Sequence, residues 1–177
     1  MPEGAAELQA TIERSYKAAF NRLPTPEEFA YWQKECKAKN MGYEDLIRAH
    51  QKWEQTGVKA DERLAMIRKA YTEVYGREPV KKEIDYWMAD IPKKGIVYDQ
   101  LCNHLKDWVS GNSREQIQEL EGVIKRAYAK ASVNGPNPDQ TRAAMSYVTS
   151  KRPFFPELVQ WVKTANKPLN VQVTPPP

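Results

Sequence analysis

The sequence is poor in the residues that most often carry out chemistry. It holds two cysteines and two histidines among 177 residues, and neither a Cys-x-x-Cys nor a His-Glu-x-x-His pattern is present. Gly-rich phosphate loops and the Gly-x-Ser-x-Gly turn of hydrolases are also missing. Because metal sites and nucleophilic triads need several convergent groups, we expect no metal site, no cofactor and no enzymatic activity.

Long apolar runs and strand patterns are equally scarce. No run approaches the 18 apolar residues that a membrane span needs, so no span is expected. Residues 1–10 lack the basic and apolar regions of a signal peptide, which predicts synthesis in the cytoplasm. The one stretch of period two is Leu169, Val171 and Val173. The sequence therefore predicts an all-α protein.

What the chain does contain is a duplication. Residues 12–53 and 67–108 align without a gap at an offset of 55, with eleven identities in 42 positions. Average composition would give about two or three by chance. The identical pairs are Ile12/Ile67, Tyr16/Tyr71, Arg22/Arg77, Pro24/Pro79, Glu28/Glu83, Tyr31/Tyr86, Trp32/Trp87, Lys39/Lys94, Tyr43/Tyr98, Leu46/Leu101 and Trp53/Trp108. A period of this length predicts a unit that buries its apolar face against its neighbours.

A weaker third copy follows at an offset of 57 from the second. Its matches are Ile67/Ile124, Ala70/Ala127, Tyr71/Tyr128, Pro79/Pro136, Met88/Met145 and Leu101/Leu158. The Tyr-Trp pair has become Ala143-Ala144. Terminal repeats diverge because one of their faces meets no neighbour, so we expect this copy to cap the array.

Each copy carries three helical patterns. In the first copy, apolar residues recur at spacings of three and four over residues 8–23, which predicts one helix there. Thr25 and Pro26, with Glu28 three residues after the threonine, are typical of a capped helix start. This second helix is expected to run to Lys39 and to be separated from the third by Gly42.

The predicted architecture is three tandem three-helix repeats of about 55 residues in a compact helical array, followed by an extended C-terminal tail. The expected divisions are residues 1–57, 58–111 and 112–166 for the repeats and 167–177 for the proline-rich tail.

The repeated motif resembles a known family. Tyr71, then Gly76-Arg77-Glu78-Pro79, then Glu83 to Trp87, then Gly95, Tyr98 and Leu101 look like the short helical repeat of uncharacterised bacterial and phage structural or surface proteins. More remotely, they are similar to the linker domains of phycobilisomes. The resemblance covers residues 12–108, and the first copy departs from it with Asn21 in place of glycine. It implies a scaffold or linker role, without pigment attachment because neither cysteine is repeated.

The cysteines and histidines do not belong to the repeated design. Cys36 aligns with Ile91, and Cys102 aligns with Ile47, so we expect two buried free thiols. His50 aligns with Leu105, and His104 aligns with Ala49. Each histidine is expected to be a partly buried packing residue.

The recurring charged and aromatic residues each allow two interpretations. Arg22 and Arg77 are expected to pair with Glu28 and Glu83 in the turn, the alternative being an anion contact. Large rings are what a short three-helix unit uses to bury area, so the tryptophans of both copies (Trp32, Trp53, Trp87 and Trp108) are expected in the core. The alternative is that they form stacking platforms for nucleotides or sugars.

Net positive charge is confined to the last third of the chain. Residues 121–177 hold eight Lys and Arg against three Asp and Glu, whereas residues 1–120 hold 19 against 20. This excess fits an acidic partner or a nucleic acid. The favoured hypothesis is nevertheless a non-enzymatic adaptor that binds other protein subunits of an assembly, in a setting such as a phage particle or a bacterial surface structure that the resemblance alone implies. The alternatives are a nucleic-acid-binding module and, if exposed tryptophans line a groove, a carbohydrate-binding module.

The tail supplies the candidate partner-binding residues. Leu169, Val171, Val173, Pro175 and Pro176 alternate apolar side chains and end in prolines. Such a segment buries too little to order itself alone, and an extended peptide of this kind binds a partner's sheet edge or groove. We predict that the tail is an assembly arm that docks on another chain.

Overall fold

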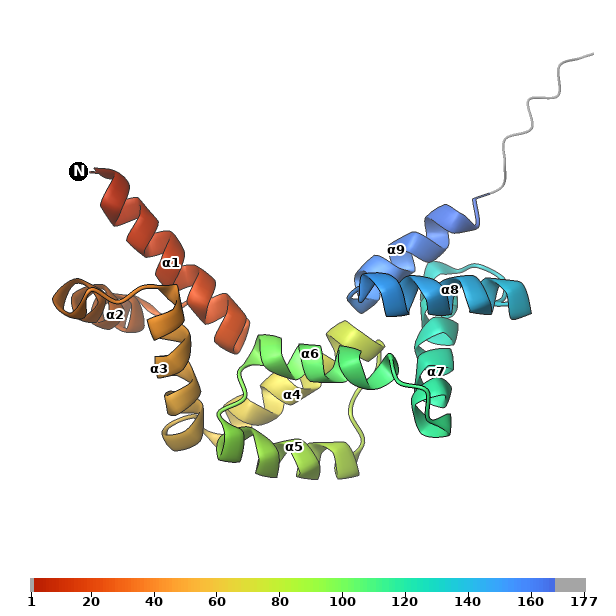
Figure 1. Ribbon diagram of the computed structural model, residues 1–177, viewed down its shortest axis with the longest axis horizontal. Coiled ribbons are helices and arrows are strands. Elements are labelled where there is room, and N and C mark those ends of the chain that lie inside the picture. Colours follow the sequence, from red (N-terminus) through yellow and green to blue (C-terminus); the bar gives the residue numbers. More distant parts are fainter. Residues whose placement is uncertain (1, 168–177) are drawn as a thin grey trace, which may run out of the picture. The chain divides into compact units, whose positions relative to one another are not determined.

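The computed structural model describes residues 2–167 and places nine α-helices in them (Figure 1). Their bounds are α1 (Pro2–Phe20), α2 (Pro26–Lys39), α3 (Tyr43–Thr56), α4 (Ala60–Tyr75), α5 (Lys81–Lys94), α6 (Tyr98–Val109), α7 (Arg114–Ala131), α8 (Pro138–Lys151) and α9 (Phe155–Ala165). The described residues contain no strand, so the all-α prediction is confirmed for them. None of their helices combines the length and apolar character that a membrane crossing requires.

The predicted cap of α2 is present. The Glu28 amide donates to Thr25 Oγ1 at 3.2 Å, and the Thr25 amide donates to Glu28 Oε2 at 2.8 Å. This reciprocal pair satisfies two of the amides that a helix start leaves without a partner. Asn137 and Gln140 make the same pair of hydrogen bonds at the start of α8, as the sequence indicates.

The bounds predicted for the first helix are wrong at both ends, whereas the predicted end of the second helix at Lys39 is confirmed. The first helix begins at Pro2 instead of Leu8 and ends at Phe20 instead of Leu23. Asn21 and Asn40 have φ of 53° and 51°, in the left-handed region that stops a helix. Asparagine adopts this conformation more readily than other residues with a side chain. It therefore replaces the glycines of the second copy, Gly76 and Gly95, at the aligned positions.

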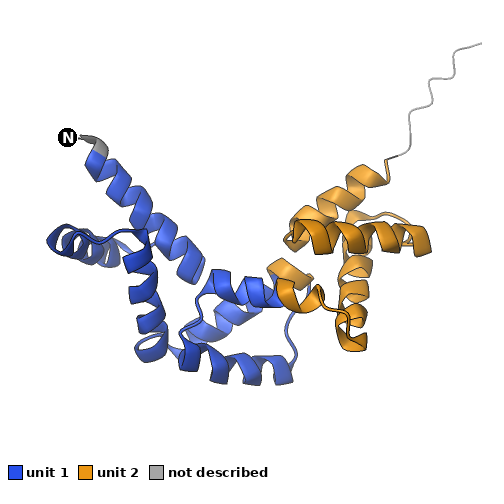
Figure 2. Ribbon diagram, viewed as in Figure 1, with its two compact units in different colours: residues 1–72, 77–105 blue, residues 73–76, 106–177 orange. Residues whose placement is uncertain are grey.

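The chain divides into two compact units, coloured separately in Figure 2. Unit 1 comprises residues 1–72 and 77–105, and unit 2 comprises residues 73–76 and 106–177. In unit 1, α1 packs on α2 and α3, and α3 packs on α5. The core of the first three helices is Ile12, Tyr16, Cys36 and Leu46, against which Phe20, Phe29 and Trp32 pack.

In unit 2, α7 packs on α8 and α9. Its buried residues include Val123, Ile124 and Tyr128 of α7, Val148 of α8, and Leu158 and Val162 of α9. Arg126 of α7 donates from Nε to the Tyr75 carbonyl at 2.8 Å, which gives one of the last carbonyls of α4 a partner.

Residues at aligned positions of the three copies share their burial. Ile12, Ile67 and Ile124 are fully buried, and so are Leu46, Leu101 and Leu158 to within one per cent. The other two sets of buried aligned residues are Tyr16, Tyr71 and Tyr128, and Cys36, Ile91 and Val148. Each copy therefore uses the same four positions, on three successive helices, for its interior.

Candidate ligand groove

A hollow of about 560 Å³ opens in unit 1 on the first three helices. Six rings line it, those of Tyr16, Phe20, Tyr31, Trp32, His50 and Trp53, and we call it the aromatic groove. Ligand pockets in proteins are commonly concave, of this size and lined by aromatic side chains with a few polar groups. The groove is therefore the candidate site.

The floor of the groove is built by one residue from each of the three helices. Trp32 Nε1 on α2 donates to the Tyr16 hydroxyl on α1 at 2.9 Å. The His50 ring on α3 lies edge-on to both, with centroids 4.7 Å from Tyr16 and 5.3 Å from Trp32. In the second copy Trp87 Nε1 donates to the Tyr71 hydroxyl at 3.1 Å, so this part of the floor recurs.

His50 is a neutral member of this floor. Its side chain is 1% exposed, and its Nε2 lies 3.0 Å from Ser15 Oγ. Because the Ser15 hydroxyl donates its hydrogen to the Ile12 carbonyl at 2.7 Å, it accepts from Nε2–H. Burial lowers the pKa of His50 to about 4, so the ring carries no charge at neutral pH. The packing role predicted for His50 is confirmed, whereas His104 is exposed.

A fork of hydrogen bonds closes one end of the groove. Arg22 Nη1 and Nη2 donate to the two carboxylate oxygens of Glu28 at 2.6 and 2.8 Å. Hydrogen bonding from Arg22 holds the pKa of Glu28 below its ordinary value. Arg77 and Glu83 form the same fork at 2.8 and 2.7 Å. The turn pairing predicted from the sequence is confirmed in both copies.

Two exposed aromatic residues form the rim. Tyr31 is 56% exposed and Trp53 is 55% exposed. Neither the Tyr31 hydroxyl nor the Trp53 Nε1 forms a hydrogen bond with any described residue, so both are free to donate to a ligand. The prediction that Trp53 lies in the core is therefore wrong. The same prediction is wrong for Trp108, which is 43% exposed.

The Trp53 ring is held over a glycine. A Cβ atom at Gly57 would lie 2.4 Å from the indole carbons, much closer than non-bonded atoms approach. The backbone here also turns back, because the Gly57 amide donates to the Trp53 carbonyl at 2.7 Å. The missing side chain at position 57 therefore provides the space in which the indole lies flat and keeps its other face accessible.

Charges along the groove cancel. Its ionisable side chains are two cations, Arg22 and Lys52, and two carboxylates, Glu27 and Glu28, beside the neutral His50. Arg22 and Glu28 are already paired with each other. The groove thus offers aromatic surface, the two free donors of its rim and the unpaired side chains of Lys52 and Glu27, with no excess charge of either sign.

A buried ion pair in unit 1 was not foreseen. Glu54 of α3 is fully buried and accepts from Arg63 Nε at 2.7 Å, while its Oε2 has no hydrogen-bond partner. Burial raises the pKa of Glu54. Both residues line a separate hollow of about 170 Å³. The alignment contained a signal, since Glu54 falls opposite Val109, an apolar residue that is also buried.

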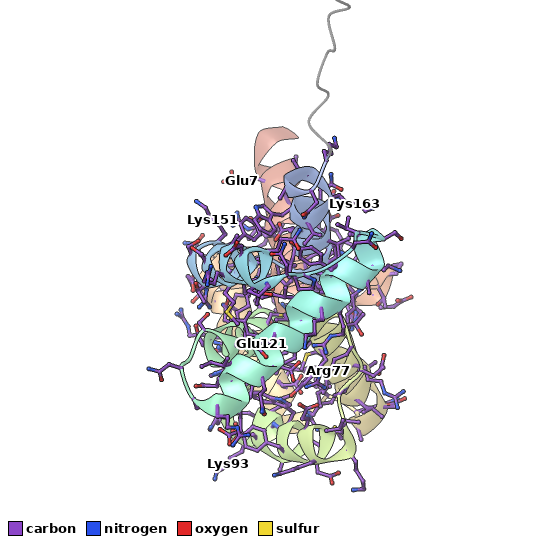
Figure 3. The ribbon with its side chains drawn as sticks, turned by 90° about the vertical axis from the view of Figure 1, so that its right-hand side faces the viewer. Glu7, Arg77, Lys93, Glu121, Lys151 and Lys163 are labelled. Carbon is purple, nitrogen blue, oxygen red and sulfur yellow. The ribbon has the colours of Figure 1, made fainter. Side chains whose placement is uncertain are left out.

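The basic residues of the last third are dispersed over unit 2. Arg126 pairs with Glu119, Arg142 with Asp139, and Arg152 with Asp107. The exposed lysines lie on different helices, as Lys151 of α8 and Lys163 of α9 illustrate in Figure 3. Three of the basic side chains are therefore already neutralised, and the others form no single line along one helix.

The remaining expectations have mixed outcomes. Cys36 and Cys102 are buried free thiols, as predicted. Residues 2–167 contain no cluster of three His, Cys, Asp or Glu side chains suited to a metal ion. The candidate partner-binding residues of the tail, Leu169, Val171, Val173, Pro175 and Pro176, lie outside the described residues.

Comparison with known proteins adds no assignment: no family model, no curated protein and no solved structure matches the chain.

Proposed function

We propose that this chain is a non-enzymatic adaptor that holds other protein subunits in a larger assembly, a phage particle or a bacterial surface or appendage structure. The observation that carries the proposal is the aromatic groove, whose rim exposes Tyr31 and Trp53. Exposed tryptophan and tyrosine rings set in a concave surface are characteristic of the residues that dominate binding energy at protein interfaces. The setting rests on the resemblance of the repeated motif.

The three-copy organisation is part of the proposal. We infer that the chain consists of three copies of one three-helix unit, the third of which has diverged as a cap. Support comes from the shared burial at aligned positions and from the recurring Arg22–Glu28 and Arg77–Glu83 forks. Copies with a common interior and different surfaces suit an adaptor, because each can present its own contact surface.

Nucleic-acid binding is the second candidate, favoured by the excess of basic residues after residue 120. Two observations weigh against it. Three of the four arginines of unit 2, Arg126, Arg142 and Arg152, are paired with carboxylates. The aromatic groove, where bases could stack, has as many carboxylates as cations.

The proposal is tested by affinity purification from the native source with tagged full-length protein. Wild type and Trp108→Ala should retain one reproducible set of proteins, and Trp53→Ala should lose it. Trp108 is a matched control because it is the aligned tryptophan, is also exposed, and lies outside the aromatic groove. At least one retained protein should then bind the purified wild type directly.

Recovery of the same proteins with Trp53→Ala would contradict a role for the groove. Recovery of DNA or RNA that dissociates as salt is raised would support the second candidate instead.

A further inference from the structure

We propose that the aromatic groove of one copy of this chain binds the proline-rich segment of a second copy, residues 168–177. The segment reads Pro-Leu-Asn-Val-Gln-Val-Thr-Pro-Pro-Pro. The inference rests on the proposed function and deepens it, because it names the chemistry of the partner that the groove takes and one source of that partner.

The exposed aromatic rings of the groove match the proline rings of the segment. Consecutive prolines favour the polyproline II conformation, and segments in this conformation dock in grooves lined by aromatic residues. The groove presents Tyr31 on α2 and Trp53 on α3 as exposed rings. Trp32 lies between floor and rim, with its ring centroid 5.1 Å from that of Tyr31. Pyrrolidine rings of Pro175, Pro176 and Pro177 are apolar bodies that such faces accommodate.

The hydrogen-bonding groups of the groove also match those of a proline-rich segment. A proline has a carbonyl that accepts and no amide that donates. The two rim groups without a partner, Tyr31 Oη–H and Trp53 Nε1–H, are both able to donate. Of the groove's two carboxylates, Glu28 already receives hydrogen bonds from Arg22 and Thr25, which leaves Glu27 as the free acceptor beside the free donors Tyr31, Trp53 and Lys52. A ligand with more acceptors than donors therefore matches the groups that the groove has left to offer.

The segment and the groove also match in charge, because neither has an excess of either sign. Residues 168–177 contain no Lys, Arg, Asp or Glu. The groove's cations and carboxylates balance, and its histidine is neutral. A neutral peptide leaves the balance of charge in such a site unchanged, whereas a phosphate would face Glu27 and Glu28 with Lys52 as the unpaired cation of the lining.

The proposed role in assembly implies that a second copy of the chain supplies the segment. A groove on one copy and its ligand on another form a head-to-tail contact, which joins copies into rings or filaments. Because proline has few backbone conformations before binding, the three consecutive prolines of the segment lose little entropy when they dock. A short segment can then join copies without a large interface.

The experiment uses two full-length variants with complementary defects. Trp53→Ala removes a rim ring but keeps the tail, and a tail variant that combines Pro175→Ala, Pro176→Ala and Pro177→Ala keeps the groove. Sedimentation velocity over a concentration series should show wild type and Trp108→Ala associating, and each defective variant associating at least about tenfold more weakly. An equimolar mixture of the two variants should form a one-to-one complex that grows no further.

A second groove variant guards against misfolding. Gly57→Ala keeps an ordinary backbone conformation, since φ is −134°, but its methyl group collides with the Trp53 indole. It should weaken association as Trp53→Ala does, with unchanged helical content by circular dichroism.

Three outcomes would overturn the inference. They are a wild type that stays monomeric throughout the series, a tail variant that associates as well as wild type, and a mixture without a complex. If the wild type is monomeric but loses its native protein partners on Trp53→Ala, the inference fails while the proposed function stands.

Discussion

The tryptophans at aligned positions divide into two environments. Trp87 is buried beside Tyr71, and Trp32 is half-buried at the equivalent place. Trp53 and Trp108 follow the same helical spacing but lie more than two-fifths exposed. Periodicity marks the side of a helix on which a residue lies, but it does not tell whether another helix covers that point. This is why the sequence placed all four in the core.

Trp87→Ala should lower the free energy of unfolding by about 3 to 5 kcal/mol, because it removes a large buried ring and leaves the Tyr71 hydroxyl without its donor. Urea denaturation of purified full-length protein, followed by circular dichroism, measures the change. Trp108→Ala is the comparison and should cost less stability, because 43% of the Trp108 side chain is exposed against 8% of Trp87. An unchanged midpoint for Trp87→Ala would mean that the ring contributes no packing.

His50 makes stability depend on pH. Its pKa is about 4 in the folded chain and about 6.5 when unfolded, so between these values the unfolded chain binds more protons. Stability should therefore fall as pH decreases from 6.5 towards 4, by about 3 kcal/mol in total from this residue.

His50→Leu isolates this contribution, because leucine occupies the aligned position 105 and is buried there. Thermal melts of wild type and variant at several pH values should show the variant losing less stability than wild type as pH falls from 6.5 towards 4. Glu54, whose raised pKa acts in the opposite sense, is common to both proteins and cancels in the comparison. Parallel pH profiles for the two proteins would contradict the prediction.

At the scale of the helix, capped starts were predicted better than the bounds of the first helix. Thr25 and Asn137 were recognisable because an N-cap and a residue three positions later form a pattern in the sequence. The end of α1 was placed three residues too late, because Asn21 takes the left-handed conformation and stops the helix before Leu23. Asn40 takes the same conformation after α2. The aligned residues Gly95 and Arg152 take the same conformation, so three different residues end the second helix of each copy.

Thr25→Ala should cost about 0.5 to 2 kcal/mol of stability, since the Glu28 amide loses its acceptor. The second copy offers the reverse test. Val80 holds the same N-cap position with φ −81° and ψ 163°, but it has no side-chain acceptor. Val80→Thr should therefore raise the stability by a similar amount.

Denaturation of the two variants against wild type measures both effects. Val80→Ser serves as a further control for the hydroxyl. A destabilised Val80→Thr protein would show that contacts of the valine methyl groups outweigh the cap.

At the level of the whole molecule, the nine helices of residues 2–167 and their all-α class followed from the sequence, because apolar residues recur along it at spacings of three and four. The aromatic groove did not follow, since it depends on which rings the packing of α1, α2 and α3 leaves uncovered. The Glu54–Arg63 ion pair was also not predicted. A charged residue that aligns with an apolar one was not considered as a candidate for burial.

A prediction at this scale concerns nucleic acids. With three of its four unit 2 arginines paired, the full-length protein should bind DNA and RNA no more tightly than the non-specific range of about 10⁻⁴ to 10⁻⁶ M at physiological salt. Fluorescence anisotropy with labelled oligonucleotides measures this. Sub-micromolar binding that weakens steeply with salt would favour the nucleic-acid alternative.

The buried pair of Glu54 and Arg63 links this fold to temperature. Removing charged groups from water is expensive in the cold and becomes less so on warming, because their hydration becomes less favourable as temperature rises. The pair therefore opposes the folded state most at low temperature and least at high temperature. A chain that encloses such a pair, in addition to the buried Ser15 and His50, loses less stability to it in a warm environment than in a cold one.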